Sequence, residues 1–132
     1  MRRLTLNTLL LPTMRAHFAR SQISQGPGVL HTHDFHEFFW IESGQGVMTT
    51  PSGSVPLSAG LLGLGHADDH HGFAAAPGQT LCLANLAVAP GDWAELIKRY
   101  RPGDDPLRWP ALSRRRLLSA AELGALRLAA GD

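Results

Sequence analysis

Short hydrophobic runs alternate with turn-forming residues over the first two thirds of the chain. Between about residues 16 and 88, runs rich in Val, Ile, Phe, Thr and Leu are separated by Gly, Pro, Ser and Asp. Runs of this length with such boundaries are typical of β-strands. The expected strands are 17–24, 29–33, 36–42, 46–50, 54–58, 60–64, 72–76 and 80–88. Seven or eight short strands with no helix between them predict a β-sandwich or β-barrel.

The pattern changes to helical spacing after Pro90. Asp92 and Glu95 have the spacing of a capping box, which predicts the start of a helix at Asp92. The residues expected along one face of that helix are Trp93, Leu96, Ile97 and Tyr100. This face is suited either to packing against the outside of the barrel or to a dimer interface.

A second helix is expected near the end of the chain. Ser119 and Glu122 repeat the capping-box spacing, and leucines follow them. Because this helix has few large residues, we expect Leu123 and Leu126 to pair with a helix of a partner molecule. The organisation predicted from the whole pattern is a β-barrel over residues 1–90 and a helical extension over 91–132.

Composition places the chain among globular proteins of one domain. It has 132 residues, of which 44% are hydrophobic and 17% charged, with a net charge of +1 when histidine is neutral. With so small a net charge, the chain has no overall electrostatic field that would attract nucleic acid or an anionic membrane. Arg114, Arg115 and Arg116 form the one basic cluster, which we expect to be solvated surface rather than a phosphate site.

Cysteine content and hydropathy indicate the compartment. Cys82 is the single cysteine, which excludes an internal disulfide and suits a reducing environment. The apolar run near the N-terminus is too short for a secretory signal, and no window approaches the roughly 18 apolar residues of a membrane helix. We therefore expect a cytoplasmic protein with no membrane partner.

The stretch HTHDFHE at residues 31–37 carries the densest candidate chemistry. On a strand, His31 and His33 point to the same side, and Glu37 has the same parity, whereas His36 has the opposite one. His71, which opens the run at 72–76, is best placed to join them from a neighbouring strand. Three imidazoles and one carboxylate suit Fe, Mn, Ni or Zn, with coordination positions left open for a ligand. The same residues can instead serve as hydrogen-bonding groups of a metal-free pocket.

Four further residues are candidates for binding a small molecule. Phe35 and Trp40 can line a sugar-binding cavity, although core packing is the alternative for both. His66 lies in the polar loop 65–71, which is either plain surface or a ligand contact. Asn85 lies between apolar neighbours on an expected strand. A buried amide there needs a partner, which is either a ligand or the adjacent backbone.

The candidate metal ligands coincide with a known motif. HTHDFHEFFWIESG resembles the first motif of the cupin superfamily: His, one residue, His, three residues, Glu, six residues, Gly. From Gly60, the spacing of the second motif reaches a histidine at His71, but the proline, second glycine and asparagine of that motif are replaced. The resemblance implies a cupin barrel, a jelly roll or double-stranded β-helix, followed here by two α-helices. It also implies a divalent transition metal held by four residues: His31, His33, Glu37 and His71.

Over about residues 15–90 the sequence resembles the N-terminal sensor cupin of AraC-type transcription regulators. The segments that carry this resemblance are HTHDFHEFFWIESGQGVM, LSAGLLGL, DDHHGF and LANLAV. It implies a small-molecule effector, with a sugar as one candidate, and a homodimer formed through the helices. DNA would be bound only through paired helix-turn-helix units, which this chain lacks. A stand-alone metal-dependent cupin enzyme, a dioxygenase, isomerase or lyase, is the alternative; we expect a sensor with no catalytic residue.

Overall fold

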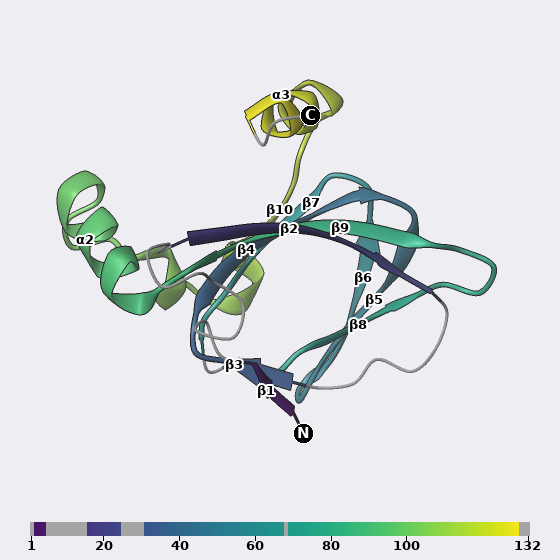
Figure 1. The fold of residues 1–132 in the computed structure, drawn as a ribbon, viewed down its shortest axis with the longest axis horizontal. Coiled ribbons are helices and arrows are strands. Elements are labelled where there is room, and N and C mark those ends of the chain that lie inside the picture. Colours follow the sequence, from purple (N-terminus) through teal and green to yellow (C-terminus); the bar gives the residue numbers. More distant parts are fainter. Residues whose placement is uncertain (1, 5–15, 25–30, 68, 130–132) are drawn as a thin grey trace.

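The computed structural model describes residues 2–4, 16–24, 31–67 and 69–129, and the side chains of 2–4, 16, 31–33, 111, 112 and 129 lie outside that description. Its strands form two main sheets that face each other, with the helices outside them (Figure 1). The β-barrel followed by two helices that the sequence pattern predicts is therefore confirmed.

The larger sheet has five strands in the order β10-β7-β4-β9-β2, and every neighbouring pair is antiparallel. The strands span Arg115–Leu117 (β10), Leu61–Gly65 (β7), His36–Ser43 (β4), Leu81–Val88 (β9) and Ala16–Ile23 (β2). The register between β4 and β9 shifts between Ile41 and Ser43, which marks a β-bulge at Glu42.

The smaller sheet has three strands in the order β6-β5-β8. They span Gly53–Ser58 (β6), Gln45–Thr50 (β5) and Gly72–Ala75 (β8). β5 and β6 form the hairpin expected around the PSGS turn, where the Thr50 hydroxyl donates a hydrogen bond to the Gly53 carbonyl at 2.9 Å. Two short segments, Arg2–Leu4 (β1) and His31–His33 (β3), pair in parallel as a separate ribbon.

The main core lies between the two sheets and follows the alternation of side chains along each strand. On β4, Phe39 and Ile41 point toward the smaller sheet and are 4% and 0% exposed. They pack there with residues of both sheets. The buried members of this cluster are Phe39, Ile41, Met48, Leu57, Ala75, Leu81 and Leu83.

Two glycines of β7 make room for larger side chains from β4. A Cβ atom added to Gly63 would lie 2.2 Å from the ring of Phe39, the residue that pairs with it across the ladder. A Cβ at Gly65 would lie 3.4 Å from Cγ of Glu37, its own ladder partner. The glycines of LLGLG therefore leave the inner face of β7 without side chains at positions 63 and 65, where Phe39 and Glu37 of β4 fit against it.

The first helix, α2 (Pro90–Tyr100), begins two residues before the expected start at Asp92, so that boundary was wrong. Proline at the first helical position has a preset φ and lacks only an N–H that would have no helical partner, which favours this start. Trp93 is buried against Val88 and Leu107, and its Nε1 donates a hydrogen bond to Asp105 at 3.0 Å. The helix therefore packs against the outside of the barrel, on one side of it in Figure 1.

The segment after α2 contains two 3₁₀ turns, Pro106–Arg108 and Ala111–Arg114, and then β10. β10 pairs with β7 and so adds a strand to the barrel from within the extension that was expected to be helical. The expectation of solvated surface for the basic cluster is wrong for Arg114, whose side chain is only 17% exposed. It holds for Arg116, which is 65% exposed.

The last helix, α3 (Ala120–Ala129), starts with the expected capping box. The Ser119 hydroxyl accepts a hydrogen bond from the Glu122 N–H at 3.1 Å, and the Glu122 carboxylate accepts one from the Ser119 N–H at 3.0 Å. The helix lies over the outer face of the larger sheet, opposite the smaller one (Figure 1). There Leu123 is buried against Trp40 and Ala84. The prediction that Leu123 meets a partner's helix was therefore wrong, because the chain's own sheet covers it.

None of the helices in the described parts of the chain is long and apolar enough to cross a membrane.

Candidate functional site

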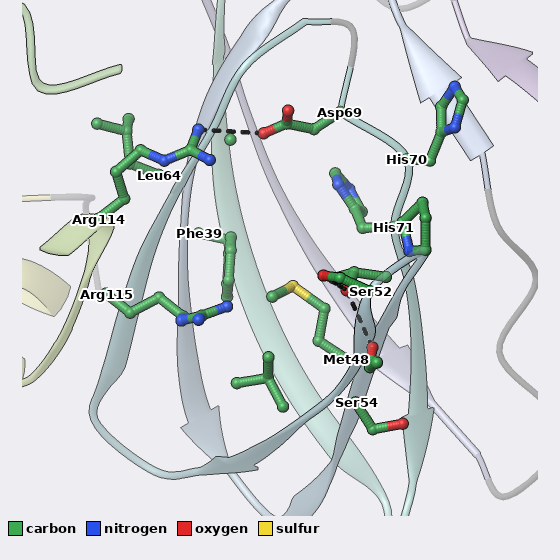
Figure 2. A pocket seen from close by; sticks show the side chains of 15 residues that line it. Phe39, Met48, Ser52, Ser54, Leu64, Asp69, His70, His71, Arg114 and Arg115 are labelled. Atoms are coloured by element: carbon green, nitrogen blue, oxygen red, sulfur yellow. Dashed lines mark hydrogen bonds and ion pairs between the residues drawn. The ribbon is translucent and has the colours of Figure 1, made fainter. Parts of the chain in front are cut away.

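A cavity of about 590 Å³ opens between β7, β10 and the β5–β6 hairpin (Figure 2). Its volume is in the range that small-molecule pockets occupy in proteins. Phe39, Met48 and Val55 supply apolar side chains, all three of which belong to or pack against the main core. Ser52 and Ser54, on the hairpin, supply hydroxyl groups. The cavity is thus an extension of the barrel interior to the surface.

Charged and titratable side chains stand around the same cavity. Arg114, Arg115, Asp69, His70 and His71 all line it. Arg114 donates a hydrogen bond from Nη1 to Oδ2 of Asp69 at 3.2 Å, drawn as a dashed line in Figure 2. The same Asp69 oxygen accepts a bond from the His66 backbone N–H at 3.0 Å, which fixes the loop between β7 and β8.

A buried polar cluster borders the cavity at His71. The Nε2 atom of His71 lies 2.9 Å from Oε1 of Glu37, and the amide of Asn85 donates a hydrogen bond to Oε2 at 3.1 Å. Glu37 and His71 are only 3% and 5% exposed. Burying a carboxylate costs free energy unless its oxygens have hydrogen-bonding partners. The contacts with His71 and Asn85 offset that cost for Glu37.

Strand register explains why these residues meet. Glu37 and Phe39 are two apart on β4, and Phe39 is paired with Asn85 on β9, so all three side chains point into the barrel. His71 comes from the start of β8 in the opposite sheet, where its ring stands at an angle to that of Phe73 with the centroids 5.3 Å apart. The inward orientation of Glu37 and the approach of His71, both expected from sequence, are found in the structure.

The other two proposed metal ligands, His31 and His33, lie in β3, whose side chains are outside the described part of the structure. Among the side chains that are described, no three His, Cys, Asp or Glu residues form a cluster that could hold a metal ion. An oxygen of Glu37 and a nitrogen of His71 lie 2.9 Å apart. Both are of the ligand types that the proposed metal site requires.

His66 lies elsewhere. Its ring packs on that of His36, with centroids 4.6 Å apart, and the His36 ring in turn contacts Trp93 of α2 edge-on at 5.8 Å. His36 is 7% exposed and accepts a hydrogen bond at Nδ1 from the Ala67 N–H at 2.9 Å. As its parity predicted, His36 points away from the barrel interior, but α2 and the adjacent loop cover it. His66 belongs to this outer cluster and is not brought to the cavity.

The two predicted aromatic ligand contacts also lie away from the cavity. Phe35 is 2% exposed and packs with Ala87 and Ala89. Trp40 is 4% exposed and points to the outer face, where its ring stacks on Phe18 at 5.7 Å beneath α3. Neither residue lines the barrel cavity, and both have the buried packing that the sequence left open as the alternative. Trp40 instead lines an apolar groove of about 850 Å³ between the larger sheet and α3.

The sequence analysis missed Arg114 and Arg115 as cavity residues, whereas Asp69 lies in the polar loop 65–71, for which a ligand contact was one of two alternatives. The triple arginine was noticed but interpreted as surface because no strand was expected there. If residues 115–117 had been recognised as a strand, alternation would have placed Arg115 and Arg116 on opposite faces of the sheet. The pairing of so short a strand with β7, however, cannot be seen in three residues of sequence.

No family model and no curated protein sequence matches the chain. Solved structures match it in fold. A cupin protein from Bacteroides fragilis superposes with a TM-score of 0.54 and 25% identity, over 61% of this chain and 71% of that one. A predicted oxalate decarboxylase from Thermotoga maritima superposes with a TM-score of 0.52 and 24% identity, over 57% of this chain and 68% of that one.

The third similarity extends past the barrel. ToxT from Vibrio cholerae, an AraC-family regulator with a cupin-like N-terminal domain, superposes with a TM-score of 0.64 and 10% identity. The match covers 88% of this chain and 47% of ToxT, so this chain spans about half of the regulator's length. Because the barrel strands β1 to β9 end at Val88, a match of that extent includes part of the helical extension. The chain therefore has the fold of the cupin superfamily and is similar to ToxT in the arrangement of its barrel and helical extension.

Proposed function

We propose that this chain is the small-molecule sensing and dimerisation domain of an AraC-type transcription regulator. One observation carries the proposal: a wall of the barrel cavity is built from Arg114 and Arg115, in the segment that leads directly into α3. A ligand in the cavity would therefore touch the connection between barrel and helix, as a sensor requires.

The path from cavity to helix is short. Arg115 and Arg116 are neighbours on β10 and point to opposite sides of the sheet. Arg116 forms an ion pair with Glu122, whose carboxylate also caps α3. A shift of Arg115 toward or away from a ligand would therefore displace its neighbour Arg116, and the ion pair of Arg116 with Glu122 is one of the contacts that hold α3. A sensor needs a ligand that binds two arrangements of barrel and helix with different affinity, and this contact is where such a difference would arise.

The likeness to ToxT supports the proposal at the level of fold. Another structure of ToxT has an unsaturated fatty acid bound, so a regulator with this arrangement takes a small organic ligand. For the present chain we infer an effector of similar small size, with a sugar as a further candidate. Contact with DNA would be made by a domain outside this chain.

We also propose a homodimer formed through the helical extension. Tyr100, Leu117 and Leu128 are 69%, 65% and 74% exposed on it. We expect light scattering at micromolar concentration to report twice the chain mass, and Leu128→Glu to shift it toward the monomer. A monomer at every concentration would contradict this part.

A divalent transition metal fits the chemistry of the buried polar cluster. Glu37 and His71 would be two of its ligands, and the sequence motif adds His31 and His33. When bound, such an ion supplies an electrophilic site for an oxygen of the effector. We expect metal bound by the untagged protein, measured by plasma mass spectrometry, to fall in His71→Ala and to be unchanged in His17→Ala. Equal metal content in both variants would contradict the site.

The sensor proposal is tested by ligand-dependent thermal stabilisation. The panel contains sugars, short carboxylic acids and their neutral analogues. Val55→Trp places a large side chain in the cavity, whereas Ser58→Trp places the same side chain on the outer face of the same strand. We expect a compound to stabilise the wild type and Ser58→Trp by about 2–3 kcal/mol at 100 times its Kd, but not Val55→Trp. Lack of binding by every compound, or equal binding by both variants, would contradict the proposal.

An enzyme is the second candidate, favoured by the buried Glu37–His71 contact and by the fold shared with the Thermotoga maritima protein. It predicts a stoichiometric redox-active metal and turnover that is lost in Glu37→Gln. A sensor predicts saturable binding without consumption of the ligand, which mass spectrometry of the recovered compound distinguishes.

A further inference from the structure

We propose that Arg114 and Arg115 form a subsite for the carboxylate of a monoanionic effector whose apolar part lies against Phe39, Met48 and Val55. This inference rests on the proposed sensing function and names the chemistry of the ligand. It is carried by strand register, by an unsatisfied buried donor and by the charge balance of the cavity.

Register directs Arg115 into the barrel. Arg115 is paired with Gly63 on β7, and Gly63 in turn is paired with Phe39 on β4. Because paired residues point to the same face of a sheet, Arg115 shares the inner face with Phe39. Figure 2 shows its side chain extending toward Phe39, across the cavity from Met48 and the hairpin serines.

Arg114 presents an unused donor in the same wall. Its side chain is 17% exposed, and Nη1 is bonded to Asp69. Its Nε atom is buried and has no hydrogen-bond partner among the described residues. A buried donor without an acceptor is unfavourable, and the guanidinium fork is suited to receive a carboxylate with two parallel bonds. Arg114 is therefore half satisfied in the structure, and an incoming carboxylate would complete it.

The charge and shape of the cavity indicate a monoanion with an apolar body. Two guanidinium groups face one carboxylate, that of Asp69, which leaves a formal charge of +1 on the lining when the histidines are neutral. A single carboxylate neutralises this charge, whereas a dianionic phosphate would exceed it and be repelled by Asp69. The three apolar residues then provide the surface for the rest of the molecule.

Asp69 would compete with a ligand carboxylate for Arg114. Its Oδ2 atom holds Arg114 and the His66 N–H together. A ligand carboxylate would take over part of the Arg114 interaction, so removal of the Asp69 charge should strengthen binding. This effect is opposite in sign to what general damage to the fold would produce.

The experiment uses three probes with one body: 4-phenylbutanoate, 4-phenylbutan-1-ol and 4-phenylbutyl phosphate. Their affinities for the whole chain are measured by isothermal titration calorimetry. We expect the carboxylate to bind at least about tenfold more tightly than the alcohol, since each bidentate charge-assisted contact is worth that much. The phosphate should bind more weakly than the carboxylate.

Variants of neighbouring residues provide matched controls. Arg114→Gln and Arg115→Gln should each weaken carboxylate binding by about tenfold and leave alcohol binding within about twofold. Arg116→Gln, on the same strand but pointing outward, should leave both unchanged. Asp69→Asn should tighten carboxylate binding by about threefold or more, with no gain for the alcohol.

Three outcomes would overturn the subsite. If the alcohol binds as tightly as the carboxylate, and Val55→Trp blocks it, the cavity is a ligand site without an anion subsite, and the proposed function survives. If Asp69→Asn weakens carboxylate binding, or the phosphate binds most tightly, the assigned monoanion chemistry is wrong. If none of the three probes binds, the subsite falls, and the proposed function then depends on the wider ligand panel alone.

Discussion

Glu37 is the residue on which the buried polar cluster depends. Both of its oxygens are engaged, by His71 at 2.9 Å and by Asn85 at 3.1 Å, from two different strands. Removing it would leave an imidazole and an amide facing each other in a buried space without an acceptor between them. The cost of such a deletion comes mainly from the partners left behind.

We predict that Glu37→Ala lowers the free energy of unfolding by about 3 kcal/mol, because it strips a buried hydrogen-bonded charge from its partners. Glu37→Gln keeps the shape and one accepting oxygen and should cost about half as much. Urea unfolding followed by tryptophan fluorescence measures both. Glu95→Ala, at an exposed position of α2, serves as the control, with a change within about 0.5 kcal/mol. A Glu37→Ala effect as small as that of the control would show that the cluster does not stabilise the barrel.

The fit of Phe39 against β7 makes a second residue-level prediction. Gly63→Ala places a methyl group 2.2 Å from the Phe39 ring and should cost about 3 kcal/mol through overpacking. In Phe39→Leu the same methyl has room, so a double-mutant cycle should give a coupling energy above about 1 kcal/mol. Gly124→Ala, which meets nothing within 4 Å, is the control and should be neutral or slightly stabilising. Additive effects in the cycle would mean that Gly63 does not face Phe39.

Single-residue parity was the most dependable guide from sequence. It placed Glu37 inside the barrel and His36 outside, as found. Applied consistently, it would also have placed Trp40 outside, since Trp40 has the parity of His36. Trp40 was instead considered for the pocket because an aromatic side chain suits a sugar-binding cavity. Asn85 was expected to need a partner, but that the partner is Glu37 follows from the register of β4 and β9, which is set by long-range pairing.

At the scale of elements, α3 is anchored at both ends by charged groups. Near its start, Glu122 pairs with Arg116 and caps the Ser119 N–H. Toward its end, Arg127 donates hydrogen bonds to the side chain and carbonyl of Glu42, at the β-bulge of β4. Between these anchors, Leu123 supplies the buried apolar contact with the sheet. The attachment of α3 therefore depends on pH and salt.

The pKa of Glu122 gives this dependence its sign. The Ser119 backbone N–H that donates to the carboxylate, and secondarily Arg116, hold the pKa of Glu122 below its ordinary value. The stabilisation is therefore complete above the unfolded value of about 4.3 and is lost as the pH falls through the lower folded value. We predict that the amides of α3 lose protection from hydrogen exchange, relative to those of β4, as the pH falls below about 4.3. Glu122→Gln, whose side chain does not ionise, should flatten this difference, and an α3 equally protected above and below that pH would count against the capping role.

Element boundaries were predictable where local chemistry sets them. The hairpin turn and the Ser119 capping box are local patterns, and both are found. α2 begins at Pro90 because proline was available at the first helical position, which outweighed the Asp92–Glu95 spacing. β10 exists only because β7 offers an edge to pair with, and its three residues carry no strand signal of their own.

At the scale of the whole molecule, the barrel and the extension are joined through shared surfaces. α2 covers the outer cluster of His36 and Trp93, α3 covers Trp40, and β10 completes the larger sheet while contributing to the cavity wall. A ligand in the cavity therefore lies against the extension as well as the barrel. This joint construction is the physical basis for expecting a sensor rather than a passive binding module.

The most direct test is hydrogen–deuterium exchange of the whole chain with and without a saturating ligand from the binding panel. Ligand binding at the cavity should change protection in the β5–β6 hairpin and, beyond it, in residues 115–117 and 120–129. Val55→Trp, treated with the same ligand, should show neither change. Protection that changes in the barrel strands alone, with β10 and α3 unaffected, would contradict the account that occupancy of the barrel is passed to the helical extension.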